Sequence, residues 1–371
     1  MDAGQVASLH TDTFLRLPLR LSQNRVYRFY RGGLLMDSFR GTPDPADSEY
    51  PEDWVGSVTP AVNPPEHTRA GEGLSWVEVD GQTRTLAELL AESPELVAGR
   101  EVVARYGATT ALLVKLLDAG SRLPVHGHPT REFARQVLDS QFGKAEAWII
   151  LATRDIPGQP SPRVWLGFRE DVGREELAGL IDRQDGAAIR GAMHEIPVKP
   201  GDAFFVRPGL LHATGAGVFL IEAQEPTDFS VVAEYQGYPI DPHKAHLGLG
   251  CDRMLDCFDR RAVTGTDLAA LCPRPSRVAD SEAQGWHEDD LLGEPSHPYF
   301  RMHRLVVHGA APWPHAGVYA VVIVTLGQGL AETSHGQVAL RRGDTLAILA
   351  GTAPSTISGD LELVVATPSF A

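Results

Sequence analysis

An internal repeat is the sequence feature that most constrains the fold of this chain. The segments GDAFFVRPGLLHATG and GDTLAILAGTAPSTI begin at Gly201 and Gly343, and each combines a Gly-Asp turn, an apolar strand of about five residues and a second glycine eight positions after the first. Three residues beyond that second glycine, the first copy has His212 and the second has Pro354. The repeat predicts two β-barrels of one type. Proline cannot ligate a metal through its side chain, so only the first barrel is expected to bind one.

Candidate metal ligands cluster in the first half of the chain. His126 and His128 stand two residues apart, so on a strand both imidazoles project from the same face. Glu146 follows on the predicted strand KAEAWII, and His212 comes from the repeat. Three imidazole nitrogens and one carboxylate oxygen suit zinc, iron, manganese, cobalt or nickel. Histidines outside this pattern, His303 and His315 among them, are interpreted as surface or structural residues.

Hydrophobic periodicity predicts a mainly β fold with helical insertions. We expect helices over 85–106, 132–138 and 171–190, where apolar residues recur at three- and four-residue spacing or the composition favours a helix. Three parts are predicted: a catalytic barrel domain over 1–236 with a helical insert near 85–106, a helix and loop connector over 237–298, and a degenerate C-terminal barrel over 299–371.

Composition narrows the classes of partner and the compartment. A net charge of −15 over 371 residues argues against binding to nucleic acid or to an anionic membrane. The three cysteines are an odd number in a long chain, which argues against a disulfide framework and fits a reducing compartment. The first residues, MDAGQVASLHTDTF, do not have the basic and then apolar pattern of a signal peptide. A cytoplasmic location is therefore expected.

Three segments resemble the type I mannose-6-phosphate isomerase family of zinc-dependent cupin enzymes. They are LLVKLLDAGSRLPVHGHP, FGKAEAWII and RPGLLHATGAGVFLIEAQEPTDF. The first departs from the family's Gln-x-His pattern, because His126 replaces the glutamine. The resemblance covers most of the chain. It implies two cupin (jelly-roll) barrels, the N-terminal one binding a single divalent metal ion, zinc by analogy, through His126, His128, Glu146 and His212.

The resemblance also suggests catalytic and substrate-binding residues. Lys144 lies two residues before Glu146, so it should border the metal pocket, and Glu222 and Asp228 are candidate pocket carboxylates. Lys115 lies on an apolar strand and is a candidate sugar or phosphate contact. The family usually has an arginine four residues after Asp228, where this chain has Val232. Arg131 or Arg135 would then have to replace it spatially.

The predicted function is metal-dependent aldose–ketose isomerisation through a cis-enediol, with mannose 6-phosphate and fructose 6-phosphate as the leading pair. This reaction needs an acid–base group near C1 and C2 and a cation near the developing oxygen charge. Three alternatives stay open. They are an isomerase of an unphosphorylated aldose, an oxygenase (since the same ligands also suit iron), and a sugar-binding protein without activity. In every case the expected partner is a small sugar or sugar phosphate.

Overall fold

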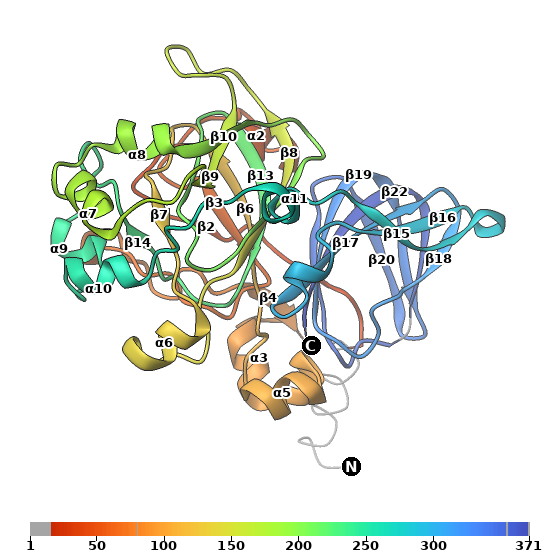
Figure 1. The fold of residues 1–371 in the computed structure, drawn as a ribbon. Coiled ribbons are helices and arrows are strands. Elements are labelled where there is room, and N and C mark those ends of the chain that lie inside the picture. The colour runs from red at the N-terminus through yellow and green to blue at the C-terminus, as the bar shows by residue number, and fades with distance from the viewer. Residues whose placement is uncertain (1–15, 80, 354, 370–371) are drawn as a thin grey trace.

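Strand pairing divides the chain into two β units, which a computed structural model describes for residues 16–79, 81–353 and 355–369. The N-terminal unit consists of two sheets that face each other, and the C-terminal unit is a single strongly curved sheet beside it (Figure 1). The fold is mainly β with helical insertions, as predicted, and is consistent with two cupin-type units.

The N-terminal unit contains a six-stranded and a five-stranded sheet within the described residues. In order across the first sheet the strands are β11 (Ala203–Val206), β8 (Glu146–Thr153), β13 (Val218–Gln224), β6 (Leu113–Ala119), β3 (Glu52–Val55) and β2 (Arg25–Val26). The second sheet runs β10 (Met193–Pro197), β9 (Arg163–Phe168), β12 (His212–Thr214), β7 (His126–Gly127) and β14 (Val231–Val232).

The six-stranded sheet is buried on both faces, which explains its long apolar runs. Leu117, Trp148 and Leu220 pack toward the second sheet, against Val164 and Leu166. The alternate residues of the same strands join a different core, which also contains residues of the C-terminal unit; examples are Leu116, Ile149, Ile221, Val321 and Ile323. Alternation therefore places one apolar face inside the first unit and the other between the two units.

The C-terminal unit is a nine-stranded sheet within the described residues. Its strands are β1 (Leu19–Arg20), β21 (Thr345–Ile348), β19 (Ala320–Thr333), β22 (Ser355–Pro368), β17 (Phe300–Val307), β16 (Trp286–Asp290), β15 (Ser276–Ser281), β18 (Ala310–Pro312) and β20 (Gly336–Arg341). The sheet curves around its own apolar core, in which Leu305, Val322 and Leu363 are buried. Pro354 and the first fifteen residues lie outside the described part of the chain.

Two parts of this sheet differ from the predicted organisation. The expected connector over 237–298 contains α-helices only as far as Leu271, and β15 and β16 then extend the C-terminal sheet. β15 was missed because it is mostly exposed and lacks an apolar alternation. In addition, β1 pairs with β21, so a short N-terminal segment contributes to the C-terminal unit.

Helices occupy the predicted insertions and the connector, and α2 (Leu34–Arg40) is a further helix that was not predicted. The others are α3 (Leu86–Glu92), α4 (Pro94–Ala98), α5 (Arg100–Tyr106), α6 (Arg131–Val137), α7 (Arg174–Asp182), α8 (Gly186–Ala192), α9 (Pro242–Ala245), α10 (Cys251–Asp256) and α11 (Gly265–Leu271), with 3-10 turns η1 (Pro65–His67), η2 (Glu282–Gln284) and η3 (Glu294–Ser296). A hairpin of β4 (Trp76–Val79) and β5 (Gln82–Thr85) leads into α3, whose first turn has a Thr85–Glu88 capping box.

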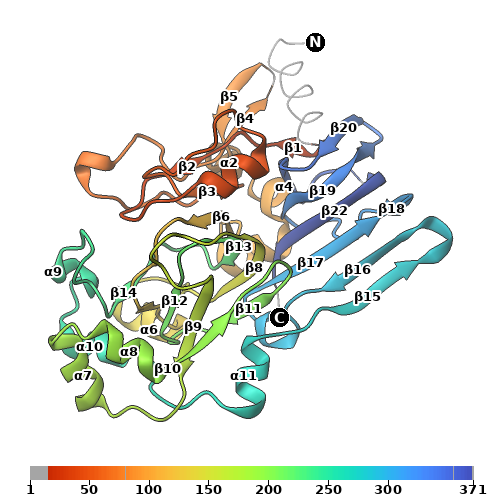
Figure 2. The same ribbon diagram turned by 90° about the horizontal axis from the view of Figure 1, so that it is seen from above.

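Both views place α7, α8 and α10 on the side of the N-terminal unit that faces away from the C-terminal sheet (Figures 1 and 2). Among the described residues, no helix combines the length and the apolar character needed to span a membrane.

The three cysteines are free thiols, as expected.

Candidate metal centre and active-site cavity

Strand pairing brings the predicted histidines together. His126 on β7 is the register partner of His212 on β12, and Val232 on β14 pairs with His126 from the other side. His128 follows two residues after His126. On the other side of β12, strand β9 also pairs with His212. The pairing of one sheet therefore fixes His126 and His212, while His128 lies just after β7, where its carbonyl oxygen accepts a hydrogen bond from the backbone N–H of Gly209 over 2.7 Å.

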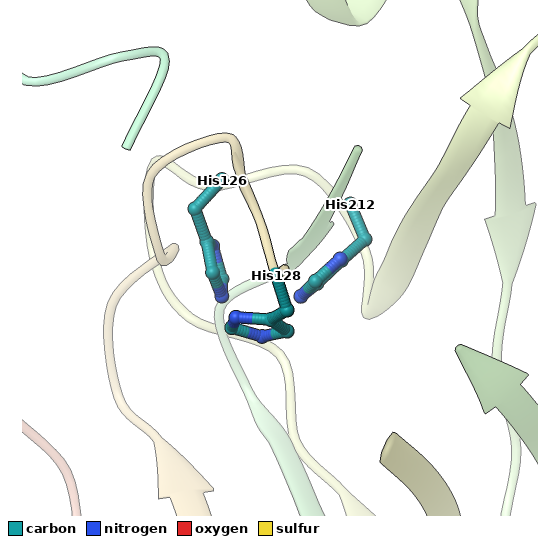
Figure 3. A group of neighbouring side chains, drawn as sticks. All are labelled: His126, His128 and His212. Carbon is teal, nitrogen blue, oxygen red and sulfur yellow. The ribbon is translucent and has the colours of Figure 1, made fainter. Parts of the chain in front are cut away.

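The three imidazoles point toward one another (Figure 3). The ring centroids of His126 and His212 are 4.2 Å apart, those of His128 and His212 are 4.8 Å apart, and those of His126 and His128 are 5.0 Å apart. One nitrogen from each ring lies within 4.8 Å of the others. Such spacing allows one ion to contact all three rings.

Backbone carbonyls orient two of the rings. Nδ1 of His126 lies 2.9 Å from the carbonyl oxygen of Pro124, and Nδ1 of His212 lies 2.8 Å from that of Leu210. A carbonyl oxygen only accepts, so each Nδ1 carries the proton and each Nε2 keeps its lone pair. Nε2 of His212 is buried without a hydrogen-bond partner among the described residues. This arrangement is typical of histidines whose second nitrogen ligates a metal.

Glu146 completes the cluster with a carboxylate. Its Oε1 lies 3.0 Å from Nε2 of His128, and its Oε2 lies 3.5 Å from Nε2 of His212. Burial opposes ionisation of Glu146, but the neighbouring His128 and the Lys144 ammonium outweigh it and hold the pKa well below its usual range. Glu146 is therefore an anion at neutral pH and can act as an oxygen ligand.

Burial keeps the three imidazoles neutral. It lowers the pKa of His126, His128 and His212 to about 3, because the desolvated cationic form is disfavoured and each ring lies beside another. Neutral imidazole is the form that ligates metals.

Two lysines predicted from the sequence lie close to this cluster. Nζ of Lys144 is 2.8 Å from Oε1 of Glu146 and 3.3 Å from Nε2 of His128. Nζ of Lys115 on β6 is 2.9 Å from Oε1 of Glu222 on β13. Burial and the charge of Glu146 raise the pKa of Glu222, against the attraction of Lys115. A carboxyl group with a raised pKa is suited to exchange protons near neutral pH.

Sequence reasoning missed Arg28. Its guanidinium lies 3.2 Å from Oδ1 of Asp228 and 3.0 Å from Oε2 of Glu52, and all three side chains border the same cavity. Despite the desolvation of Arg28, these two carboxylates raise its pKa. No local pattern marks this residue, because it follows β2 and meets Glu52 and Asp228 through tertiary contacts.

These residues surround a cavity of about 680 Å³. The cavity is lined by Lys115, Lys144, Glu146, Glu222 and Asp228, and also by His126, Arg28 and Val232. Its volume falls within the range of small-molecule sites.

Of the residues predicted to be catalytic or to bind substrate, Arg131 does not line this cavity. Its Nε lies 2.5 Å from Oε1 of the buried Glu225, and its guanidinium stacks over Tyr299. Arg131 therefore does not take the place of the family's arginine at the cavity.

The comparisons with known proteins agree with this geometry. No family model matches the chain. A mannose-6-phosphate isomerase of Streptococcus mutans is 29% identical over 284 residues, which cover 75% of this chain and 79% of the relative. The chain is a homologue of the mannose-6-phosphate isomerases. A protein of Bacillus subtilis described as a probable mannose-6-phosphate isomerase is 26% identical over 77% of this chain and 82% of its own length.

Solved isomerase structures share the fold. The mannose 6-phosphate isomerase of Bacillus subtilis superposes with a TM-score of 0.72 at 22% identity, over 94% of this chain and 99% of its own. A zinc-bound mannose 6-phosphate isomerase has a TM-score of 0.71 at 15% identity, over 95% of this chain and 99% of its own. At these identities the structures establish the fold alone, including both β units.

Proposed function

We propose that this protein is a metal-dependent mannose-6-phosphate isomerase. The observation that carries the proposal is the buried group of three neutral imidazoles and one carboxylate, which borders a cavity together with Lys144. The homology to enzymes of that name supports the choice of reaction. The donor set contains no thiolate, and its free, buried Nε2 lone pair at His212 fits a divalent ion such as zinc.

His126, His128, Glu146 and His212 would hold the ion. When bound, it would act as a Lewis acid near the sugar oxygens and stabilise the negative charge that develops on them. The imidazole tautomers are already set by Pro124 and Leu210, so the ligands need little reorganisation.

The remaining groups of this chain would bind the sugar and move the proton between C1 and C2. Lys144 lies next to the ligand carboxylate, where its ammonium can donate a proton or a hydrogen bond to a sugar oxygen. Glu222, with its raised pKa, is placed to exchange a proton or to hold a hydroxyl group. Asp228 is fixed by Arg28 and by the backbone N–H of Val62, which donates to its Oδ2 over 3.0 Å.

The phosphate group would be bound at the mouth of the cavity. Among the described basic residues lining the cavity, Arg28, Lys115 and Lys144 are buried beside carboxylates, whereas Lys244 on α9 is exposed. We assign Lys244 to the phosphate because its charge is available to an incoming anion. The proposal also places Val232, which the structure locates at the cavity wall, in the position from which an arginine could reach the substrate.

A substrate panel tests the proposal. Protein loaded with zinc should convert mannose 6-phosphate to fructose 6-phosphate, and treatment with a chelator should abolish the activity until zinc is restored. A higher kcat/KM for mannose than for mannose 6-phosphate would favour an isomerase of unphosphorylated aldoses. The absence of the family's arginine at Val232 is consistent with that alternative. No turnover of any aldose by metal-loaded protein would contradict the isomerase proposal.

A further inference from the structure

A second group of potential metal ligands lies in the C-terminal unit. Glu288 is on β16 and His303 on β17, and His315 follows β18. In the register of these two strands Glu288 is opposite Leu305, and His303 is opposite Asp290. Glu288 and His303 therefore lie on one face of the sheet, two residues apart diagonally. Leu305 on that face belongs to the core enclosed by the C-terminal unit, so this group faces the interior.

The three side chains converge on one oxygen atom. Nδ1 of His303 lies 2.5 Å from Oε1 of Glu288, and Nε2 of His315 lies 2.9 Å from the same oxygen. The two ring centroids are 4.9 Å apart, and one potential ligand atom from each residue lies within 4.8 Å of the others. The exposed fractions of the side chains are 5% for Glu288, 12% for His303 and 13% for His315.

Protein contacts do not account for all the polar atoms of this group. Nε2 of His303 is buried without a hydrogen-bond partner among the described residues, whereas Nε2 of His315 has the Glu288 carboxylate 2.9 Å away. The ring of Trp313 packs edge-on against His315, at 5.4 Å between centroids, and limits the access of water. Burying a carboxylate and two imidazoles costs desolvation free energy, and the unpaired Nε2 of His303 leaves part of that cost without a compensating hydrogen bond.

The ionisation of Glu288 fits a ligand role. Burial opposes its ionisation, but contacts with His303 and His315 prevail and lower the pKa of Glu288 to about 2. The carboxylate is thus negative at neutral pH. The group resembles the His126 cluster, where a carboxylate oxygen also lies 3.0 Å from an imidazole nitrogen inside a β unit.

We propose that Glu288, His303 and His315 form a second binding site for a divalent cation, inside the C-terminal unit. Two imidazole nitrogens and one carboxylate oxygen form a set that zinc binds in proteins, with water filling the remaining position. The site would join β16 and β17 to the segment after β18 and stabilise the C-terminal unit. The expectation that this unit binds no metal rested on Pro354 alone, and the second site uses other residues.

Metal stoichiometry tests the second site independently of any enzymatic activity. Protein stripped with a chelator, saturated with zinc and desalted should contain two equivalents by mass spectrometry. The pair His128→Ala with His212→Ala should retain one equivalent, and the pair His303→Ala with His315→Ala should also retain one. His308 is exposed on the same unit and pairs with Asp360, so His308→Ala is the matched control and should retain two.

A wild-type stoichiometry of one at saturating zinc, unchanged by His303→Ala with His315→Ala, would overturn the second site. Anomalous diffraction from wild-type crystals grown with zinc tests the site without relying on the folding of any variant. A peak between Glu288 and His315 supports the site, and a single peak at the His126 cluster contradicts it.

In the His128→Ala, His212→Ala background, zinc should still raise the midpoint of thermal unfolding, and Glu288→Gln should remove this effect.

Discussion

The ammonium of Lys144 lies 2.8 Å from a carboxylate oxygen of Glu146, and both side chains are more than 95% buried. Lys144 comes two residues before Glu146, at the point where β8 begins. The pair joins the proposed metal ligand to the proposed proton-transfer group. Both side chains line the substrate cavity.

Replacing Lys144 by methionine should remove the ammonium while keeping most of the side-chain volume. We expect kcat/KM for mannose 6-phosphate to fall by about 10²- to 10⁴-fold, the usual contribution of a positioned acid or base. Zinc content should be unchanged, since Lys144 is not a ligand. The exposed Lys199, between β10 and β11, provides a control, because Lys199→Met should retain full activity. Activity of Lys144→Met within threefold of wild type would exclude Lys144 from the chemistry.

The sequence predicted the metal cluster because its signals are local. The spacing of His126 and His128 places both rings on one face of a strand, and the repeat frame marks His212. The structure brings these rings together through direct register pairing of β7 and β12. Their role as ligands stays a prediction that metal analysis must test.

Other features depend on tertiary contacts that no local pattern records. Arg28 lies two residues after the short strand β2 and meets Asp228 and Glu52 at the cavity. Glu288 and His303 meet because β16 pairs with β17, and His315 joins them from the segment after β18. Arg131 was expected to contact substrate in place of the family's arginine, whose position holds Val232. Its side chain instead lies outside the cavity, where it pairs with Glu225.

Val232→Arg tests whether the missing guanidinium limits the reaction with phosphorylated sugars. Val232 is 7% exposed, lines the cavity and pairs with His126, so an arginine there can extend toward the substrate. A charged hydrogen bond contributes about 1.5–3 kcal/mol, so kcat/KM for mannose 6-phosphate should rise by about 10- to 100-fold. Val232→Met is the uncharged control of similar length. An equal increase in Val232→Met would attribute the effect to shape instead of charge.

Lys244→Gln should weaken the binding of the phosphorylated substrate. The side chain is exposed at the cavity, so solvent screens its charge, and we expect KM for mannose 6-phosphate to rise by about 3- to 10-fold. The kcat value should stay unchanged because the phosphate is remote from C1 and C2. Steady-state kinetics measure KM and kcat separately, with Lys199→Gln as the control. An unchanged KM in Lys244→Gln would place the phosphate elsewhere.

The metal-free protein should lose stability on mild acidification. His126, His128 and His212 have pKa values of about 3 in the folded state, below the value of about 6.5 in unfolded chains. The unfolded state therefore binds more protons between these values. Stability from these groups is complete above pH 6.5 and decreases as the pH falls toward 3.

Urea unfolding of chelator-treated protein between pH 7.5 and 4.5 measures this dependence. The midpoint should decrease steadily below pH 6.5, and His212→Gln should flatten the slope by removing one of the three groups. A midpoint that stays constant from pH 6.5 to 5 would mean that the imidazoles bind protons to the same extent in the folded and unfolded states, and would contradict this prediction.

The most direct test of the proposed function is proton NMR of mannose 6-phosphate in D₂O with zinc-loaded protein. Isomerisation through a cis-enediol should produce fructose 6-phosphate and exchange the proton at C2 of the aldose or C1 of the ketose with solvent deuterium. The His128→Ala, His212→Ala variant should show neither the fructose 6-phosphate signals nor the exchange of the C1 or C2 proton. Unchanged spectra with zinc-loaded wild-type protein, or product formed equally well by that variant, would contradict the account.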